Sequence, residues 1–110
     1  MSKPALFLIE RGYYNMNKFE HGKIAVTRGV YDAMANNASF AEFVRKSLYE
    51  KYLNCDWGDT CNEDAKSNDY ALGHENRILA VYTQPGTDNT IWIITEWDRS
   101  ATTVLFPSEY

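Results

Sequence analysis

Carboxylates are concentrated in one short stretch of the chain. Residues 56–69 contain a single cation, Lys66, and five acidic residues, namely Asp56, Asp59, Glu63, Asp64 and Asp69. Paired carboxylates can bind a divalent metal or act in acid–base catalysis. Acidic residues also favour the N-terminus of a helix, because its dipole attracts anions. The stretch therefore has three interpretations: the start of a helix, an acidic surface that faces a partner, or a catalytic or metal site.

Other residues that could carry out chemistry stand outside any recognised motif. Ser100 lies in DRSATT rather than in a GxSxG turn. His21 and His74 are far apart in the sequence, and a Cys61–His74 pair across a helix is the one nucleophile arrangement to consider. No EF-hand spacing and no glycine-rich phosphate loop is present. The sequence thus indicates no catalytic residue, no metal ligand set and no cofactor.

Two tryptophans and one arginine are candidates for recognition. Trp57 and Trp97 lie in polar loops, where each either covers the edge of the core or anchors a partner. Arg99, between Asp98 and Ser100, either belongs to a turn or contacts a partner. We expect Arg99 to pair with Asp56 or Asp59, so that loop 55–59, the following helix and turn 97–101 form one surface. The candidate partner-binding residues are Asp56, Trp57, Asp59, Glu63, Asp64, Trp97 and Arg99.

Composition limits the protein class. The 110 residues are enough for one domain with its own core, and 45% are hydrophobic. The net charge of −4 disfavours direct binding to nucleic acid. No apolar run reaches the ~20 residues of a membrane span, and the run at 5–9 is too short for a signal peptide. We expect a cytoplasmic protein in which Cys55 and Cys61 are reduced, although a bridge between them is conceivable.

The C-terminal third predicts three antiparallel strands. Residues 77–84, 90–96 and 102–106 are rich in β-branched and aromatic side chains, and Pro85-Gly86 supplies a hairpin turn. Along the middle strand, Ile91, Ile93 and Thr95 alternate with Trp92, Ile94 and Glu96. Both faces begin with apolar residues, so we expect both to be covered near the start of this strand.

The rest of the chain predicts a strand and helices. Residues 23–27 read as a strand of the same sheet, and Thr27 can cap a short helix. Capping boxes Ser39–Glu42 and Thr60–Glu63 predict helices 39–53 and 60–72, with Gly73 at C′ and Asn68 in need of hydrogen-bond partners. Residues 1–21 are an added edge strand (5–9) or a mobile arm. The expected fold is α+β, a mostly antiparallel sheet with two to three helices packed on it, in a single domain 1–110.

Three segments also carry a resemblance. WGDTCNEDAKSND (57–69), RILAVY (77–82) and IWIITEWDRSATTVLFPSEY (91–110) resemble a group of small uncharacterised proteins carried on plasmids, phages and conjugative elements. The similarity covers residues 22–110 and supplies no catalytic residues. It implies a mobile-element protein, a context in which small acidic domains often inhibit host defence systems.

Two functional hypotheses follow. The first is a non-enzymatic inhibitor, of the anti-CRISPR or antirestriction kind, that docks its acidic surface on a host protein, for instance a nucleic-acid-binding defence protein. The second is a small metal-assisted or carboxylate-dependent hydrolase, which requires the acidic segment to converge with Glu96 or Arg99. The sequence does not determine the oligomeric state.

Overall fold

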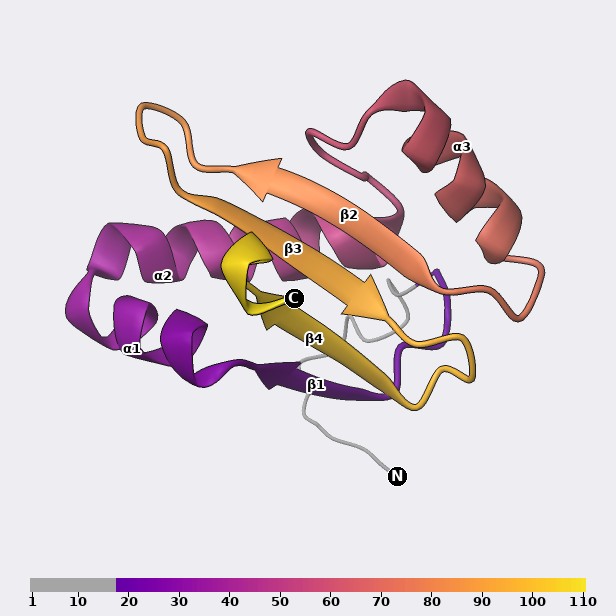
Figure 1. Ribbon diagram of the computed structural model, residues 1–110, viewed down its shortest axis with the longest axis horizontal. Coiled ribbons are helices and arrows are strands. Elements are labelled where there is room, and N and C mark those ends of the chain that lie inside the picture. Colours follow the sequence, from indigo (N-terminus) through magenta and orange to yellow (C-terminus); the bar gives the residue numbers. More distant parts are fainter. Residues whose placement is uncertain (1–17) are drawn as a thin grey trace.

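A four-stranded sheet with the strand order β1-β4-β3-β2 organises the chain (Figure 1). The computed structural model describes residues 18–110. β2 (Ile78–Thr83) is antiparallel to β3 (Thr90–Thr95), and β3 is antiparallel to β4 (Ala101–Leu105). β1 (Lys23–Val26) joins the same sheet, as predicted, and runs parallel to β4 at one edge. The predicted α+β class is confirmed. The candidate strand at 5–9 lies outside the described residues.

The helices lie on one face and along one edge of this sheet. α1 (Arg28–Asn36) leads into α2 (Ala38–Arg45), which continues as a π-helical segment, Lys46–Lys51, and a 3-10 turn, Tyr52–Asn54. α2 runs behind the strands in Figure 1, while α3 (Asn62–Ala71) lies beside β2. Thr27 caps α1 as expected, since its Oγ1 accepts a hydrogen bond from the Val30 amide.

The predicted start of the second helix is wrong by two residues. Asn37, not Ser39, is the N-cap of α2, and its Oδ1 accepts a hydrogen bond from the Phe40 amide at 3.0 Å. Ser39 lies in the first turn, where its Oγ accepts from the Gln84 side chain. Because Asn caps as well as Ser does, the Ser-x-x-Glu pattern alone could not decide between the two positions.

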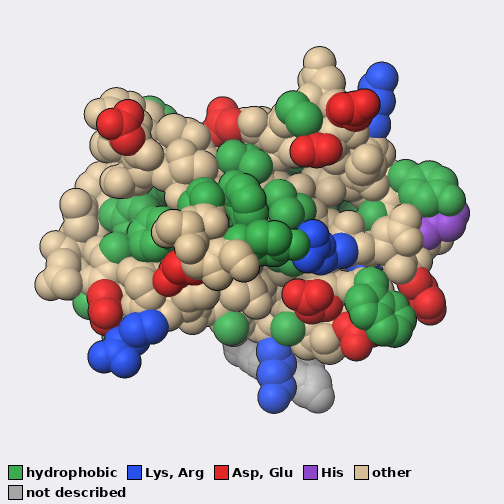
Figure 2. Space-filling model, viewed as in Figure 1, with side chains coloured by type: hydrophobic (Ala, Val, Ile, Leu, Met, Phe, Trp, Pro, Cys, Tyr) green, Lys and Arg blue, Asp and Glu red, His purple; other side chains and the backbone are tan. Residues whose placement is uncertain are grey.

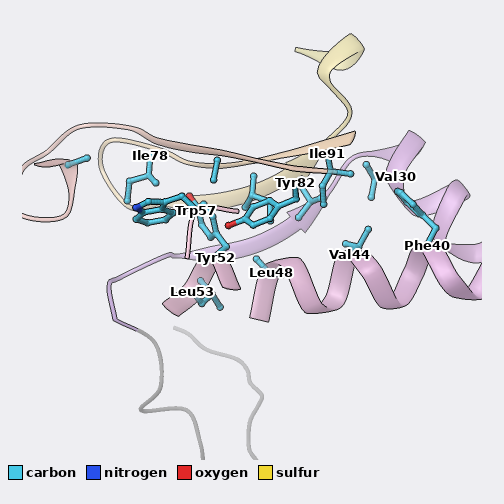
Figure 3. Close-up of a cluster of buried hydrophobic side chains, with 14 residues drawn as sticks. Val30, Phe40, Val44, Leu48, Tyr52, Leu53, Trp57, Ile78, Tyr82 and Ile91 are labelled. Carbon is cyan, nitrogen blue, oxygen red and sulfur yellow. The ribbon is translucent and has the colours of Figure 1, made fainter. Parts of the chain in front are cut away.

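The core lies between α2 and the sheet face that it covers (Figure 3). The expected helical stripe is present: Phe40, Val44, Leu48 and Tyr52 are all buried, and Phe43 packs against the cluster. The facing strand residues alternate as their register requires, and are Ile78, Ala80, Tyr82, Ile91, Ile93 and Val104. Burying a side chain of this size contributes about 1.5–3 kcal/mol, so this layer supplies most of the stabilisation.

A chain of hydroxyl groups crosses the same core. The Thr102 hydroxyl donates to the carbonyl oxygen of His21 at 2.7 Å, which commits its one proton. The 2.7 Å contact between the Thr95 and Thr102 hydroxyls then requires Thr95 to donate, and the 2.7 Å contact from Tyr52 requires Tyr52 to donate in turn. Burial raises the pKa of Tyr52 well above its ordinary value, which keeps the donor protonated.

The opposite face of the sheet carries no α-helix in the described part of the chain. Its side chains, from the alternate strand positions, include Leu79, Val81, Trp92, Ile94 and Leu105. The C-terminal 3-10 turn, Pro107–Glu109, lies on this face (Figure 1), and Tyr110 packs edge-on against Trp92 with ring centroids 5.3 Å apart. The start of β3 is therefore covered on both sides, on this side by the last residue of the chain.

Glu109 fixes that tail. Its Oε1 accepts hydrogen bonds from the Thr27 hydroxyl at 2.7 Å and from the Phe106 amide at 2.8 Å. These bonds, the Thr27 one first, hold the pKa of Glu109 below its ordinary value. A carboxylate at the N-terminus of α1 also interacts favourably with the helix dipole.

Candidate binding surface

The acidic segment is positioned by its contacts with the outer edge of β2. The Asp59 amide donates to the Val81 carbonyl at 2.8 Å, and the Val81 amide donates to the Thr60 hydroxyl at 2.8 Å. Further along the edge, the Asn68 side chain accepts from the Leu79 amide and donates to the Leu79 carbonyl. These are the partners that Asn68 was expected to need. Loop and helix thus close a strand edge that would otherwise pair with another chain.

Of the two predictions about the ends of α3, the one at the N-terminus is wrong and the one at the C-terminus is confirmed. Thr60 is not the N-cap, because its hydroxyl donates to the Trp57 carbonyl and accepts from β2; Cys61 takes the cap position without a side-chain bond. Gly73 follows the C-cap residue Leu72 and so takes the expected C′ position, with a φ that is not positive. Arg99, from a distant turn, provides further donors for this helix end.

Trp57 belongs to the core. It is 7% exposed, its ring meets Tyr52 with centroids 5.5 Å apart, and its Nε1 donates to the Asp69 carboxylate at 2.9 Å. The next residue, Gly58, has a φ of +61°, and its backbone packs directly against the Tyr82 ring, where a Cβ would collide. Two roles were considered for Trp57, and its burial fits the first, covering the edge of the core. Trp57 is not exposed as an anchor for a partner.

The four candidate carboxylates, Asp56, Asp59, Glu63 and Asp64, are all exposed, and they differ in whether they form hydrogen bonds with the described chain. Asp56 accepts from the Gly58 amide at 3.0 Å, and Asp59 accepts from the Thr83 amide at 2.8 Å. Glu63 and Asp64, in the first turn of α3, favour the helix dipole, and no hydrogen bond or ion pair ties their side chains to the described chain. The ion pairs within residues 18–110 lie in α1 and around α2, so this segment keeps its negative charge.

Arg99 does not pair with Asp56 or Asp59. Its guanidinium donates to five carbonyl oxygens, and the shortest bonds reach Ala71 at 2.6 Å and Asn76 at 2.7 Å. The other three acceptors are the carbonyls of His74, Glu96 and Trp97. The charge of Arg99 is thus stabilised by carbonyl oxygens at and near the C-terminal end of α3, where the helix dipole favours a cation. The expected ion pair is wrong.

The expected single surface is wrong for the same reason. Asp59 is bonded to Thr83 at one end of β2, while Arg99 is bonded to the carbonyl of Asn76, two residues before Ile78 at the other end. Five residues of strand separate them, about 16 Å at ~3.3 Å per residue. The acidic segment therefore does not converge with Glu96 or Arg99, as a hydrolase built from these groups would require.

Exposed aromatic rings gather at the Arg99 end instead. Trp97 and Tyr70 are 57% and 58% exposed, and the Tyr70 ring stacks on His74 with centroids 3.8 Å apart. The carbonyls of Trp97 and His74 both accept from the Arg99 guanidinium, so the two backbones lie side by side. Trp97 remains a candidate contact residue, but at the opposite end of α3 from the carboxylates. Sequence reasoning did not select Tyr70, whose spacing to His74 (i, i+4) was the available signal.

The described residues offer little to nucleophile or metal chemistry. Cys55 is half-buried, Cys61 is exposed, and neither forms a disulfide. Cys61 and His74 flank opposite ends of α3, a ten-residue helix about 15 Å long, so they do not form a pair. In residues 18–110, no three His, Cys, Asp or Glu side chains come together as a metal-binding group.

Comparison of the sequence with protein-family models, with curated proteins and with solved structures finds no match. Within the described part of the chain, no helix has the length and apolar character needed to cross a membrane.

Proposed function

We propose that the protein acts by binding, not by catalysis, and that the acidic segment 56–64 is its contact surface. The observation that supports this most is the pair Glu63 and Asp64. Both are exposed, and no hydrogen bond or ion pair ties either side chain to the described chain. Asp56 and Asp59 add two more negative charges on the same segment, and the wider stretch 56–69 contains one cation, Lys66.

The partner that suits such a surface is a protein with a basic groove. Carboxylates that project from a rigid segment can occupy positions meant for nucleic-acid phosphates. Electrostatic complementarity of this kind speeds association and gives specificity, and it weakens as salt is added. The segment is rigidly held, because its residues Asp59 and Thr60 bond to the edge of β2, so little order has to be gained on binding.

The biological role that we propose is inhibition of a host defence protein that handles nucleic acid, as in anti-CRISPR or antirestriction systems. This part rests on the resemblance of residues 57–69, 77–82 and 91–110 to small proteins of mobile elements. Occupying a phosphate-binding groove would block the host protein without any covalent step.

The test is capture from a host-cell lysate on immobilised protein. The double variant Glu63→Gln/Asp64→Asn removes two charges and no described hydrogen bond, so it should fold normally and recover less partner. The matched control is Glu20→Gln/Asp88→Asn, which removes two exposed charges elsewhere. Added double-stranded DNA should release a captured partner that uses its phosphate groove. Equal recovery by the double variant and the wild type would refute the electrostatic argument.

A further inference from the structure

We propose that the exposed aromatic rings at the C-terminal end of α3 bind an arginine side chain of a partner protein. This aromatic patch consists of Tyr70, His74 and Trp97. It lies at the other end of α3 from Glu63 and Asp64, so the inference does not depend on the proposed function. Figure 2 shows hydrophobic side chains at the right-hand end of the molecule, some of them beside a histidine, with Asp and Glu side chains close by.

Arg99 holds the two parts of the aromatic patch next to each other. One nitrogen of its guanidinium, Nη1, donates to the carbonyl oxygen of Trp97 at 3.4 Å, and the other, Nη2, donates to that of His74 at 3.0 Å. One side chain therefore fixes the backbone on both sides of the patch, and little order has to be gained there when a ligand binds.

The histidine of the patch presents an acceptor. Its Nδ1 lies 2.7 Å from the carbonyl oxygen of Tyr70, which can only accept, so Nδ1 of His74 carries a proton. In the neutral ring Nε2 is then unprotonated, and no hydrogen bond ties it to the described chain. The rings of Tyr70 and His74 stack with their planes 7° apart, which fixes the direction of this acceptor. The patch therefore offers a lone pair to a ligand that donates hydrogen bonds.

Two carboxylates flank the same rings. Glu75 follows His74 and is exposed, while Glu96 precedes Trp97 and is half-buried. No hydrogen bond or ion pair ties either carboxylate to the described chain. Together with the imidazole nitrogen, they make a set of acceptors around aromatic rings.

The charges near the patch favour a cation as the ligand. Segments 66–77 and 96–99 contain four carboxylates and three cations, namely Asp69, Glu75, Glu96, Asp98, Lys66, Arg77 and Arg99. Both arginines are engaged, Arg99 with backbone carbonyls and Arg77 over the Tyr110 ring at 5.3 Å. The segments keep a net charge of −1 in a chain of net charge −4, so they attract cations and repel phosphates.

Arginine is the cation whose shape fits these groups. Its planar guanidinium stacks on aromatic rings, tryptophan best, and carries five donors that can reach carboxylates and an imidazole nitrogen. An ammonium group is a compact, strongly hydrated charge and satisfies fewer of these contacts at once. A nucleobase could stack on Trp97, but Glu75 and Glu96 would repel its phosphates. The expected ligand is therefore an arginine on an accessible segment of a partner protein.

NMR titration of the full chain with a capped peptide of three arginines alternating with glycines tests this. The indole N–H signal of Trp97 should shift, lysine in place of arginine should bind more weakly, and citrulline should not bind. Trp97→Ala should weaken arginine binding by about 2- to 5-fold or more, read from the amide signals of Tyr70 and His74. Glu75→Gln/Glu96→Gln should weaken binding and reduce its dependence on salt.

Two control variants make the result specific. Tyr31→Ala removes a similarly exposed ring from α1 and should bind the peptide like the wild type. Glu63→Gln/Asp64→Asn should leave the shift of Trp97 unchanged, which separates this site from the proposed function. If circular dichroism shows that Trp97→Ala does not fold, Tyr70→Leu replaces it and should weaken binding as well.

The result that would overturn the inference is a wild-type Trp97 signal that does not move at millimolar arginine peptide. Equal binding of the citrulline peptide would overturn it too, because the charge would then have no part in recognition. So would a loss of binding confined to Glu63→Gln/Asp64→Asn, or tighter binding of a single-stranded oligonucleotide than of the arginine peptide.

Discussion

Replacing Arg99 by alanine should destabilise the fold severely, although the residue lies in a surface turn. Two of its five hydrogen bonds, to the carbonyls of Ala71 and Glu96, are partly buried, and the other three are exposed. A hydrogen bond to a charged group contributes about 1.5–3 kcal/mol when it is sheltered, and little when water can replace it. A cation at a helix C-terminus adds about 0.3–1 kcal/mol.

The expected loss is therefore about 2–4 kcal/mol in the free energy of unfolding, after a discount for the half-exposed position of Arg99. For a domain of this size, that corresponds to a fall of about 10–25 °C in the melting temperature. The loss should persist in high salt, because the acceptors are carbonyl dipoles held in direct contact and not distant charges. Thermal and urea unfolding at low and high salt measure both quantities.

Three further variants make the test specific. Arg99 has a φ of +61°, which costs a non-glycine residue about 1–2 kcal/mol, so Arg99→Gly should be less harmful than Arg99→Ala by about that amount. Arg99→Lys keeps the charge but loses the fork of donors, and should fall between alanine and the wild type. Arg28→Ala, which breaks an exposed ion pair, should cost under about 0.5 kcal/mol. An Arg99→Ala loss no larger than this control would refute the reasoning.

Three other changes test separate parts of the fold. Asn68→Ala leaves the amide and carbonyl of Leu79 unpaired and should cost about 2–3 kcal/mol in urea unfolding; a loss under ~0.5 kcal/mol would contradict the role given to this edge. Tyr52→Phe removes the first donor to Thr95 and should lower the melting temperature by about 4–8 °C, the equivalent of ~1 kcal/mol, whereas no change would argue against the hydroxyl chain. Glu109 has a lowered pKa, so its contribution is fully present above its ordinary value of 4.5 and is lost as pH falls through the lower folded value. The difference in melting temperature between the wild type and Glu109→Gln should therefore shrink below about pH 4.5, and a difference that grows there would reverse the sign of this argument.

The sheet and the main helix could be predicted because their signals are local and repeated. Strands β2, β3 and β4 appear as runs of β-branched and aromatic residues, and the apolar stripe from Phe40 to Tyr52 has helical spacing. Helix starts were less certain, because several residue types cap equally well and a hydroxyl can bond elsewhere. Thr60 illustrates this: its hydroxyl is used by the Trp57 carbonyl and the Val81 amide, 21 residues further along the chain.

The role of Arg99 could not be predicted, because its acceptors are backbone oxygens. The sequence around Arg99 shows two neighbouring carboxylates, Glu96 and Asp98, and counting charges therefore favours an ion pair. Carbonyl groups are present at every residue and leave no signal in the sequence. Only the end of a helix, packed against a turn, gathers enough of them to compete with a carboxylate.

The structure also separates carboxylates that the sequence treats alike. Asp59 and Asp69 each bond to the fold, through the Thr83 amide and the Trp57 indole, so part of the acidity of this segment has a structural cause. Glu63 and Asp64 have no such bonds, and helix dipoles contribute under about 1 kcal/mol to each. If acidity at this edge served folding alone, neutralising these two would change stability slightly and nothing else. A loss of partner binding with an unchanged melting temperature is therefore the result that distinguishes a contact surface from a well-placed helix start.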